Sequence, residues 1–157
     1  MQRKKMEVPE HWLSAVQRPD GSRKKVVLYT TSASVLYTQK EQGIEKMKEA
    51  FRLFQEEQEQ ITVLWRPDAK AEDFLKESRP EIWEEYLKLL TEYKEAGWGI
   101  YDDSQDLERA VDFCDACYGD GGRAANMCHV AGKPLMIQDV TKKQPLEVRD
   151  GFPGFVF

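Results

Sequence analysis

Short apolar runs of strand-like composition alternate along the chain with longer segments in which apolar residues recur at helical spacing. The first run, residues 25–30, is apolar on both faces, as a central strand of a parallel sheet is. Such alternation is typical of β-α-β units around a parallel sheet. We therefore predict an α/β fold, a Rossmann-like three-layer domain with a mainly parallel sheet of about five strands. Its strands are expected at residues 25–30, 61–65, 98–101, 116–118 and 134–138.

The periodic segments predict the helices between these strands. Over residues 43–59 one apolar stripe is formed by Ile44, Met47, Phe51 and Phe54. The segment from Pro80, which suits a first helical turn, to Gly97, which suits a helix end, has a buried face made of Ile82, Trp83, Tyr86, Leu87, Leu90 and Tyr93. Shorter helical segments are expected around residues 74–75, at 107–113 with Asp102-Asp103-Ser104 as cap, and from the glycine run 119–122 to about residue 130.

The length of 157 residues fits one domain. We expect a polar extension or former linker at residues 1–25, in which Trp12 and Leu13 dock, a Rossmann-like nucleotide-binding domain at 26–140, and an irregular C-terminal tail at 141–157. The net charge of -5, with basic and acidic residues interspersed, argues against a nucleic-acid partner. No apolar stretch approaches the roughly 20 residues that span a bilayer, and no secretion signal is visible. We therefore expect no transmembrane segment and a cytoplasmic location.

The cysteines and histidines do not predict a metal centre. Cys128 and His129 are adjacent and would point about 100° apart on a helix. Buried thiols in a reducing compartment are therefore favoured over zinc for the three cysteines, Cys114, Cys117 and Cys128. The other histidine, His11, lies in the polar extension, so no Ser-His-Asp or Cys-His constellation is expected. The catalytic residues stay unknown, and we expect neither a metal nor a cofactor.

Polar residues follow each predicted strand, where an open parallel sheet binds its ligand. Arg66 is suited either to a phosphate or to a structural salt bridge with Asp68 or Asp102. Thr31 and Ser32 offer hydroxyl and N-H donors, although capping is the safer interpretation. The acidic pair Asp102-Asp103 resembles the metal pocket of receiver domains, but the first strand is followed by threonines instead of the acids that such a pocket needs.

A glycine run follows the fourth predicted strand, at Gly119-Asp120-Gly121-Gly122. Glycines let backbone N-H groups approach a phosphate, and they also make plain tight turns. Gly119, Gly121 and Ala124 match the spacing of the dinucleotide fingerprint, which normally opens the first β-α unit and not the fourth. Arg123 is suited to clamp a phosphate or to remain solvated in a first helical turn.

Five ordered motifs together resemble the C-terminal half of CDP-glycerol glycerophosphotransferase-like proteins of Firmicutes, over about residues 8–140. They are Val26-Val27-Leu28-Tyr29-Thr30-Thr31-Ser32, Leu64-Trp65-Arg66-Pro67, Trp98-Gly99-Ile100-Tyr101-Asp102-Asp103, Asp115-Ala116-Cys117-Tyr118-Gly119-Asp120-Gly121 and Gly132-Lys133-Pro134-Leu135-Met136-Ile137-Gln138. The resemblance implies a GT-B transferase architecture. In it this domain grips the nucleotide diphosphate, and a separate N-terminal domain brings the acceptor and often the catalytic base.

Two departures from the family's pattern fall at the expected site. The family has Arg-Pro-His where this chain has Arg66-Pro67-Asp68, and Gly-Asp-Gly-Ser-Ser where it has Gly119-Asp120-Gly121-Gly122-Arg123. We therefore expect nucleotide-diphosphate binding without catalysis by this chain alone, at Thr31, Ser32, Arg66, Asp68, Asp102, Asp103, Asp120, Gly121, Gly122 and Arg123. The expected partners are a companion N-terminal half or a second copy of the chain. The alternative is a non-catalytic protein-interaction module that retains the fold and forms a dimer or binds a partner through the aromatic tail or the face that the missing domain would cover.

Overall fold

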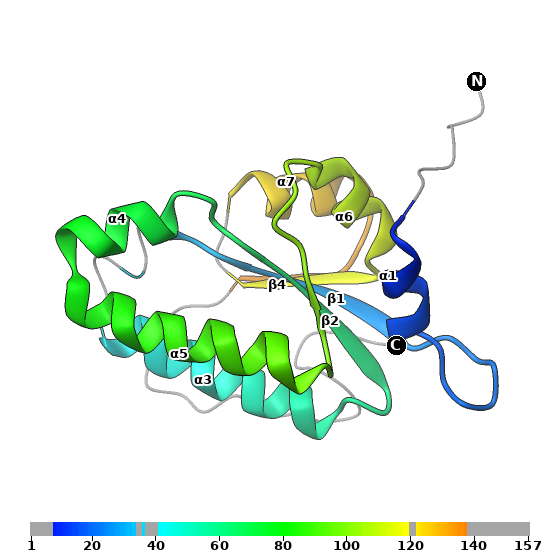
Figure 1. Cartoon of the computed structure of the whole chain (residues 1–157). Helices are drawn as coiled ribbons and strands as arrows, with labels where there is room; N and C mark the ends of the chain where they lie inside the picture. The colour runs from blue at the N-terminus through cyan, green and yellow to red at the C-terminus, as the bar shows by residue number, and fades with distance from the viewer. Residues whose placement is uncertain (1–7, 34–35, 37–40, 120–121, 138–157) are drawn as a thin grey trace.

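Five strands form one sheet in the computed structural model, which describes residues 8–33, 36, 41–119 and 122–137 (Figure 1). Every neighbouring pair is parallel, and the strand order is β3-β2-β1-β4-β5. The strands are β1 (Lys25–Thr31), β2 (Ile61–Pro67), β3 (Ile100–Tyr101), β4 (Ala116–Gly119) and β5 (Leu135–Ile137). The predicted α/β class and parallel sheet are confirmed.

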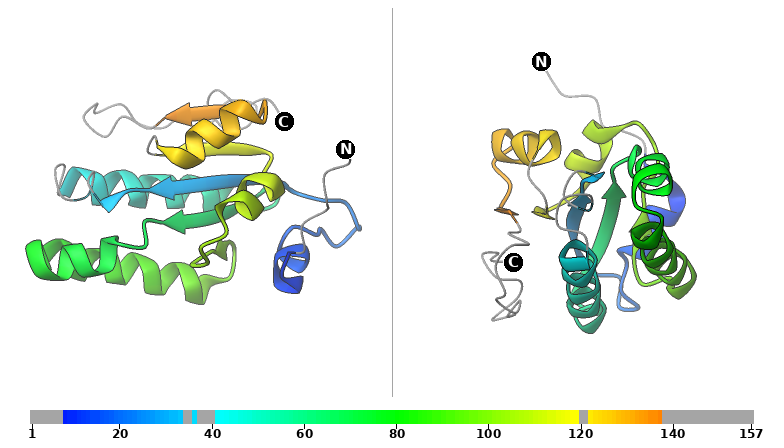
Figure 2. Two further views of the ribbon diagram at one scale, coloured as in Figure 1. Left: turned by 90° about the horizontal axis from the view of Figure 1, so that it is seen from above. Right: turned by 90° about the vertical axis from the view of Figure 1, so that its left-hand side faces the viewer.

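Helices cover both faces of this sheet, which makes the predicted three layers (Figure 2). One face packs against α3 (Glu41–Glu56), α4 (Ala71–Ser78) and α5 (Pro80–Ala96). The other packs against α1 (Glu10–Ala15), α6 (Leu107–Phe113) and α7 (Arg123–Val130). Because side chains alternate along a strand, Tyr29 of β1 joins the first layer and Leu28 joins the second.

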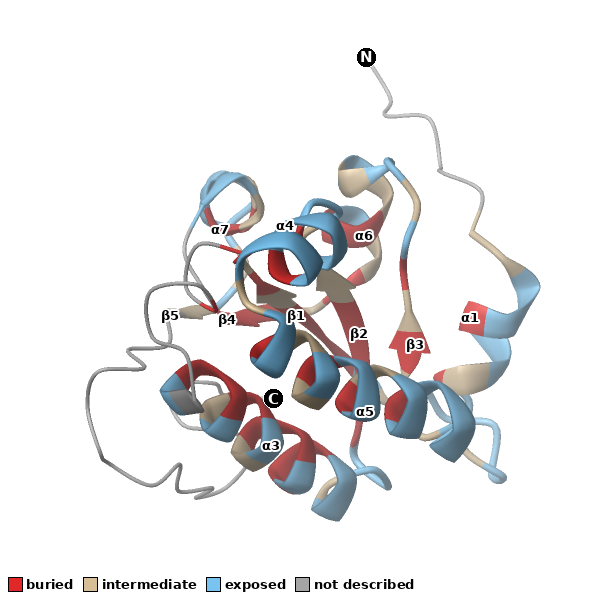
Figure 3. Cartoon of the chain, turned by 60° about the vertical axis from the view of Figure 1, so that its left-hand side comes forward, coloured by how far each residue is buried: buried red, intermediate tan, exposed pale blue. Residues whose placement is uncertain are grey.

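The apolar stripe predicted for α3 is buried in full, and the buried faces of the helices turn toward the strands in Figure 3. Helix α5 begins at Pro80 and ends at Ala96, capped by Gly97, whose φ of 74° is left-handed, as expected. Its buried face differs from the prediction at Leu87, which is 42% exposed, and at Leu89, which is buried instead. Trp83 and Leu90 are only partly buried. The side chain of Leu87 lines the cleft described below.

The N-terminal segment contributes Trp12 and Val16 to the core. Trp12 of α1 is buried, as predicted, whereas Leu13 is half exposed. Trp12 packs against the ring of Phe113 at a centroid distance of 5.3 Å. The tail at 141–157 lies outside the described residues.

The cap predicted for α6 is wrong. Asp106 is the N-cap, and its side chain accepts a hydrogen bond of 3.0 Å from the backbone N-H of Arg109. Asp102 instead accepts from the backbone N-H of Ser104 at 3.0 Å and from the Ser104 hydroxyl at 2.6 Å. The preceding strand is also shorter than predicted, with only Ile100 and Tyr101 in β3. Asp102 is thus directed into the molecule and not along α6.

The strand order reverses at β1, which lies between β2 and β4. The chain adds β2 and β3 on one side of β1 and then crosses to add β4 and β5 on the other. Gly119, the last residue of β4, pairs with Thr30 of β1 and has a φ of 136°. A side chain on Gly119 would collide with the backbone of Thr30. Glycine therefore allows the two strand ends to approach closely at the reversal.

Candidate functional site

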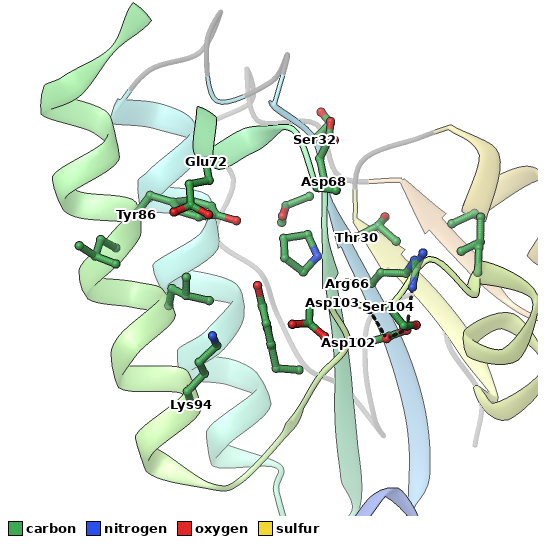
Figure 4. Close-up of a pocket in the computed structure, with 18 of the residues that line it drawn as sticks. Thr30, Ser32, Arg66, Asp68, Glu72, Tyr86, Lys94, Asp102, Asp103 and Ser104 are labelled. Atoms are coloured by element: carbon green, nitrogen blue, oxygen red, sulfur yellow. Dashed lines mark hydrogen bonds and ion pairs between the residues drawn. The ribbon is translucent and has the colours of Figure 1, made fainter. Parts of the chain in front are cut away.

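A cleft of about 800 Å³ opens at the carboxyl edge of the sheet. Its polar lining comes from the ends of β1, β2 and β3 and from the starts of α4 and α7, and its apolar wall belongs largely to α5. Figure 4 shows Glu72, Tyr86 and Lys94 on the helical side of the cleft, with Arg66, Asp102, Asp103 and Ser104 at the strand ends. The cleft thus lies where the strand order predicts a ligand site.

The structure brings most of the expected site residues to this cleft, namely Thr31, Ser32, Arg66, Asp68, Asp102, Asp103 and Arg123. Gly122 directly precedes Arg123 and is the N-cap of α7, with a φ of 136°. Asp120 and Gly121 lie outside the described residues, so the expected contacts of the glycine run stay predictions. The loops after several parallel strands do meet, as the sequence predicted.

Arg66 forms an ion pair with Asp102, which decides between the two carboxylates considered for it. Arg66 Nη1 lies 2.8 Å from Asp102 Oδ2, and the Asp102 side chain is only 2% exposed. A buried carboxylate is costly unless charged and hydrogen-bonding partners surround it. In this state the charge of Arg66 is therefore neutralised within the chain, although its side chain lines the cleft.

Asp68 ties the loop after β1 to the loop after β2. Its Oδ2 accepts from the backbone N-H of Ala33 at 3.2 Å, and its Oδ1 accepts from that of Lys70 at 3.0 Å. Its own N-H donates to the carbonyl of Thr31 at 2.9 Å. The Thr31 hydroxyl accepts from Nε1 of Trp65 at 3.2 Å. Asp68 and Thr31 thus hold the two loops in place in addition to lining the cleft.

The α5 wall was not predicted as part of the site. The helical period assigned Tyr86 to the core, and this side chain is buried, yet it also lines the cleft. Burial raises the pKa of Tyr86, and nearby Tyr101, Asp68 and Glu72 add to the effect. Tyr86 is therefore a neutral phenol at physiological pH, able to donate a hydrogen bond. No pattern in the sequence indicates that this helix extends past the strand ends.

The cleft is not strongly cationic. Among the described residues, its lining carries three basic side chains and four carboxylates, which are Arg66, Lys94, Arg123, Asp68, Glu72, Asp102 and Asp103. An anion bound here would depend on individual donors and not on a positive field. Within the described part of the chain, no group of three or more His, Cys, Asp or Glu residues is arranged to hold a metal ion.

The three cysteines are buried free thiols, as predicted, and they belong to one core cluster: Cys114 follows α6, Cys117 lies in β4 and Cys128 lies in α7. Hydrogen bonding to Cys128 and burial raise the pKa of the Cys114 and Cys117 thiols. Lys133 donates to the Cys114 carbonyl at 2.6 Å. His129 is exposed, so it does not complete a ligand set with the thiols.

Comparisons with known proteins do not place the chain in a family. No protein-family model matches it, and neither a curated protein nor a solved structure does so. Among the described residues, none of the helices is long and apolar enough to cross a membrane. The resemblance to glycerophosphotransferase-like proteins therefore rests on the sequence motifs.

Proposed function

We propose that the cleft binds the diphosphate of a nucleotide ligand of the CDP-glycerol or nucleotide-sugar type. One observation carries the proposal. The strand order reverses at β1, and the cleft lies at that carboxyl edge with two arginines, Arg66 and Arg123, contributed by separate elements. Open α/β sheets bind ligands in the crevice at such a reversal, because helix N-termini present N-H donors there.

The start of α7 supplies donors for one phosphate. Arg123 is its first residue and is exposed, and the backbone N-H groups of a first helical turn lack intrahelical partners. A Cβ placed on Gly122 would find no atom within 4 Å, so the backbone at this turn is open to an approaching group. Thr31 at the end of β1 and Ser32 in the loop that follows also line the cleft. Together these groups support charge-assisted hydrogen bonds to a diphosphate.

We propose binding without turnover by this chain alone. No histidine lines the described part of the cleft, and Tyr86 keeps its proton because of its raised pKa. Asp102 is committed to Arg66, and Asp68 accepts backbone N-H groups. The acceptor and the catalytic base would come from a companion N-terminal half. Of the two surfaces considered for the alternative interaction module, the aromatic tail at residues 152–157 lies outside the described residues.

Isothermal titration calorimetry with CDP-glycerol, CDP and UDP-sugars tests this proposal. At least one ligand is expected to bind with a Kd below 1 mM, which corresponds to about 4 kcal/mol. Arg123→Ala should weaken the binding by about tenfold, the value of one charge-assisted contact. Arg52→Ala is the matched control, because Arg52 pairs with Glu56 on the exposed side of α3 and does not line the cleft. Absence of sub-millimolar binding by every ligand would refute the proposal.

A further inference from the structure

Asp102 is approached by a second arginine, which the sequence did not indicate. Arg109 Nη2 lies 3.8 Å from Asp102 Oδ1 and donates to the Ser104 hydroxyl at 3.1 Å. Arg109 belongs to α6 and is not among the side chains that line the cleft, whereas Arg66 is. One buried carboxylate thus has one cation inside the cleft and another outside it.

The two oxygens of Asp102 have different partners. Among the described residues, Oδ2 is held by Arg66, whereas Oδ1 accepts both donors of Ser104 and lies near Arg109. A buried carboxylate that loses its last cation is strongly destabilising, but one that keeps a cation and two hydrogen bonds is not left uncompensated. Asp102 can therefore lose Arg66 and remain paired.

Arg109 has the capacity to take over the carboxylate. Its guanidinium lies over the ring of Trp12, with 4.7 Å between the guanidinium carbon and the ring centroid. Its Nε is buried and makes no hydrogen bond within the described residues. The stack on a buried tryptophan keeps the guanidinium beside Asp102, and the Nε donor remains for a new contact. A small movement of Arg109 toward Asp102 would break no other ion pair among the described residues.

We propose that Arg109 is a positioning residue that releases Arg66 to the ligand. When a diphosphate enters the cleft, Arg66 turns from Asp102 to a phosphate oxygen, and Arg109 with Ser104 keeps Asp102 paired. This release rests on the proposed function, but the sharing of Asp102 by two arginines does not. The exchange explains how a cleft whose central arginine is neutralised within the chain can still hold an anion.

A double-mutant cycle without ligand tests the shared carboxylate. Arg66→Gln and Arg109→Gln are each expected to shift the urea unfolding equilibrium only modestly, because the other arginine stays on Asp102. In the double variant the unfolding equilibrium constant should be about tenfold larger than the product of the two single effects predicts. When the cycle is repeated in an Asp102→Asn background, this excess should disappear, because no buried carboxylate is left without a cation. Effects that simply multiply would overturn the sharing. Circular dichroism establishes that each variant is folded before it is compared.

Titration with CDP and inorganic pyrophosphate tests the release of Arg66. Arg109→Gln should weaken binding by about tenfold even though the residue does not line the cleft, because Arg66 is then retained by Asp102. Adding Asp102→Asn to Arg109→Gln should restore the affinity, a rescue that a merely structural role of Arg109 would not produce. Unchanged binding by Arg109→Gln, or no rescue, would overturn the release. If the wild-type chain binds neither probe, the release is overturned; the calorimetry with CDP-glycerol and UDP-sugars then decides the proposed function separately, and the unfolding cycle decides the sharing.

Discussion

Two glycines with the same φ angle offer a test of how closely β4 packs against β1, where the strand order reverses. Gly119 and Gly122 both have a φ of 136°, a conformation that L side chains rarely adopt. A Cβ on Gly119 would collide with the backbone oxygen and nitrogen of Thr30, but one on Gly122 would meet nothing within 4 Å. Alanine at either position therefore causes backbone strain, and only alanine at Gly119 also forces β4 away from β1.

The magnitudes follow from these two terms. Gly122→Ala is expected to lower the free energy of unfolding by about 1–3 kcal/mol, the cost of a side chain in a sparsely populated backbone region. Gly119→Ala has the same strain and adds about 1–3 kcal/mol, typical of overpacking, because Thr30 belongs to the central strand and cannot yield easily. Together the two terms would consume much of the stability of an ordinary domain.

Urea unfolding followed by tryptophan fluorescence and far-ultraviolet circular dichroism measures both variants against the wild-type chain. The expected result is a lower unfolding midpoint for Gly119→Ala than for Gly122→Ala, with a similar slope for both. If the two variants unfold at the same midpoint, the close approach of β4 to β1 at Thr30 is refuted. If Gly122→Ala is as stable as the wild type, the backbone strain assigned to that turn is refuted.

Two further predictions concern the core. Trp12→Ala should lower the free energy of unfolding by about 3–5 kcal/mol, because a large buried side chain is removed; Leu13→Ala is the half-exposed control, and a similar midpoint for both would contradict the docking of α1. Burial raises the pKa of Tyr86 and Tyr93 above that of an unfolded tyrosine, about 10. The contribution of these two tyrosines to the free energy of unfolding should therefore be fully present below about pH 10. It should fall as the pH rises further, because the unfolded chain releases these protons more readily. Urea unfolding midpoints are compared at pH 9 and pH 11 for the wild-type chain and for Tyr86→Phe, which shows the contribution of the other titrating groups. If the midpoint of the wild-type chain falls no further than that of Tyr86→Phe, the prediction for Tyr86 is contradicted.

The location of the candidate site could be predicted from the sequence, but its ion pairs and hydrogen bonds could not. Parallel strands end at one edge, so Thr31, Arg66, Asp102 and Arg123 were expected together, and they line one cleft. The partner of Arg66 remained open in the sequence, because Asp68, two residues further along, and Asp102, after the next strand, were both expected at the same edge of the sheet. The strand order places β2 beside β3, and the turn of Asp102 toward Ser104 completes the pair.

The α5 wall and Arg109 were missed for a related reason. Helical period shows which side of a helix is apolar, but not whether that side meets a sheet or extends beyond its edge. Helix α5 has 17 residues beside a β3 of two residues, so part of its apolar face lines the cleft. Arg109 looked like an ordinary charged residue of a short helix. Its place beside Asp102, with its guanidinium over the ring of Trp12, depends on a residue that is far away in the sequence.

The sequence by itself determined the kinds and positions of the elements, because periodicity, glycines and prolines act over a few neighbouring residues. The stripe of α3, the start of α5 at Pro80 and its cap at Gly97 follow from such local terms. Tertiary structure alone decided the strand order, the partner of each buried charge, and the choice of Asp106 over Asp102 as helix cap. These outcomes depend on desolvation and on contacts between distant segments, since a buried carboxylate such as Asp102 is stabilised by the cations that the fold brings to it.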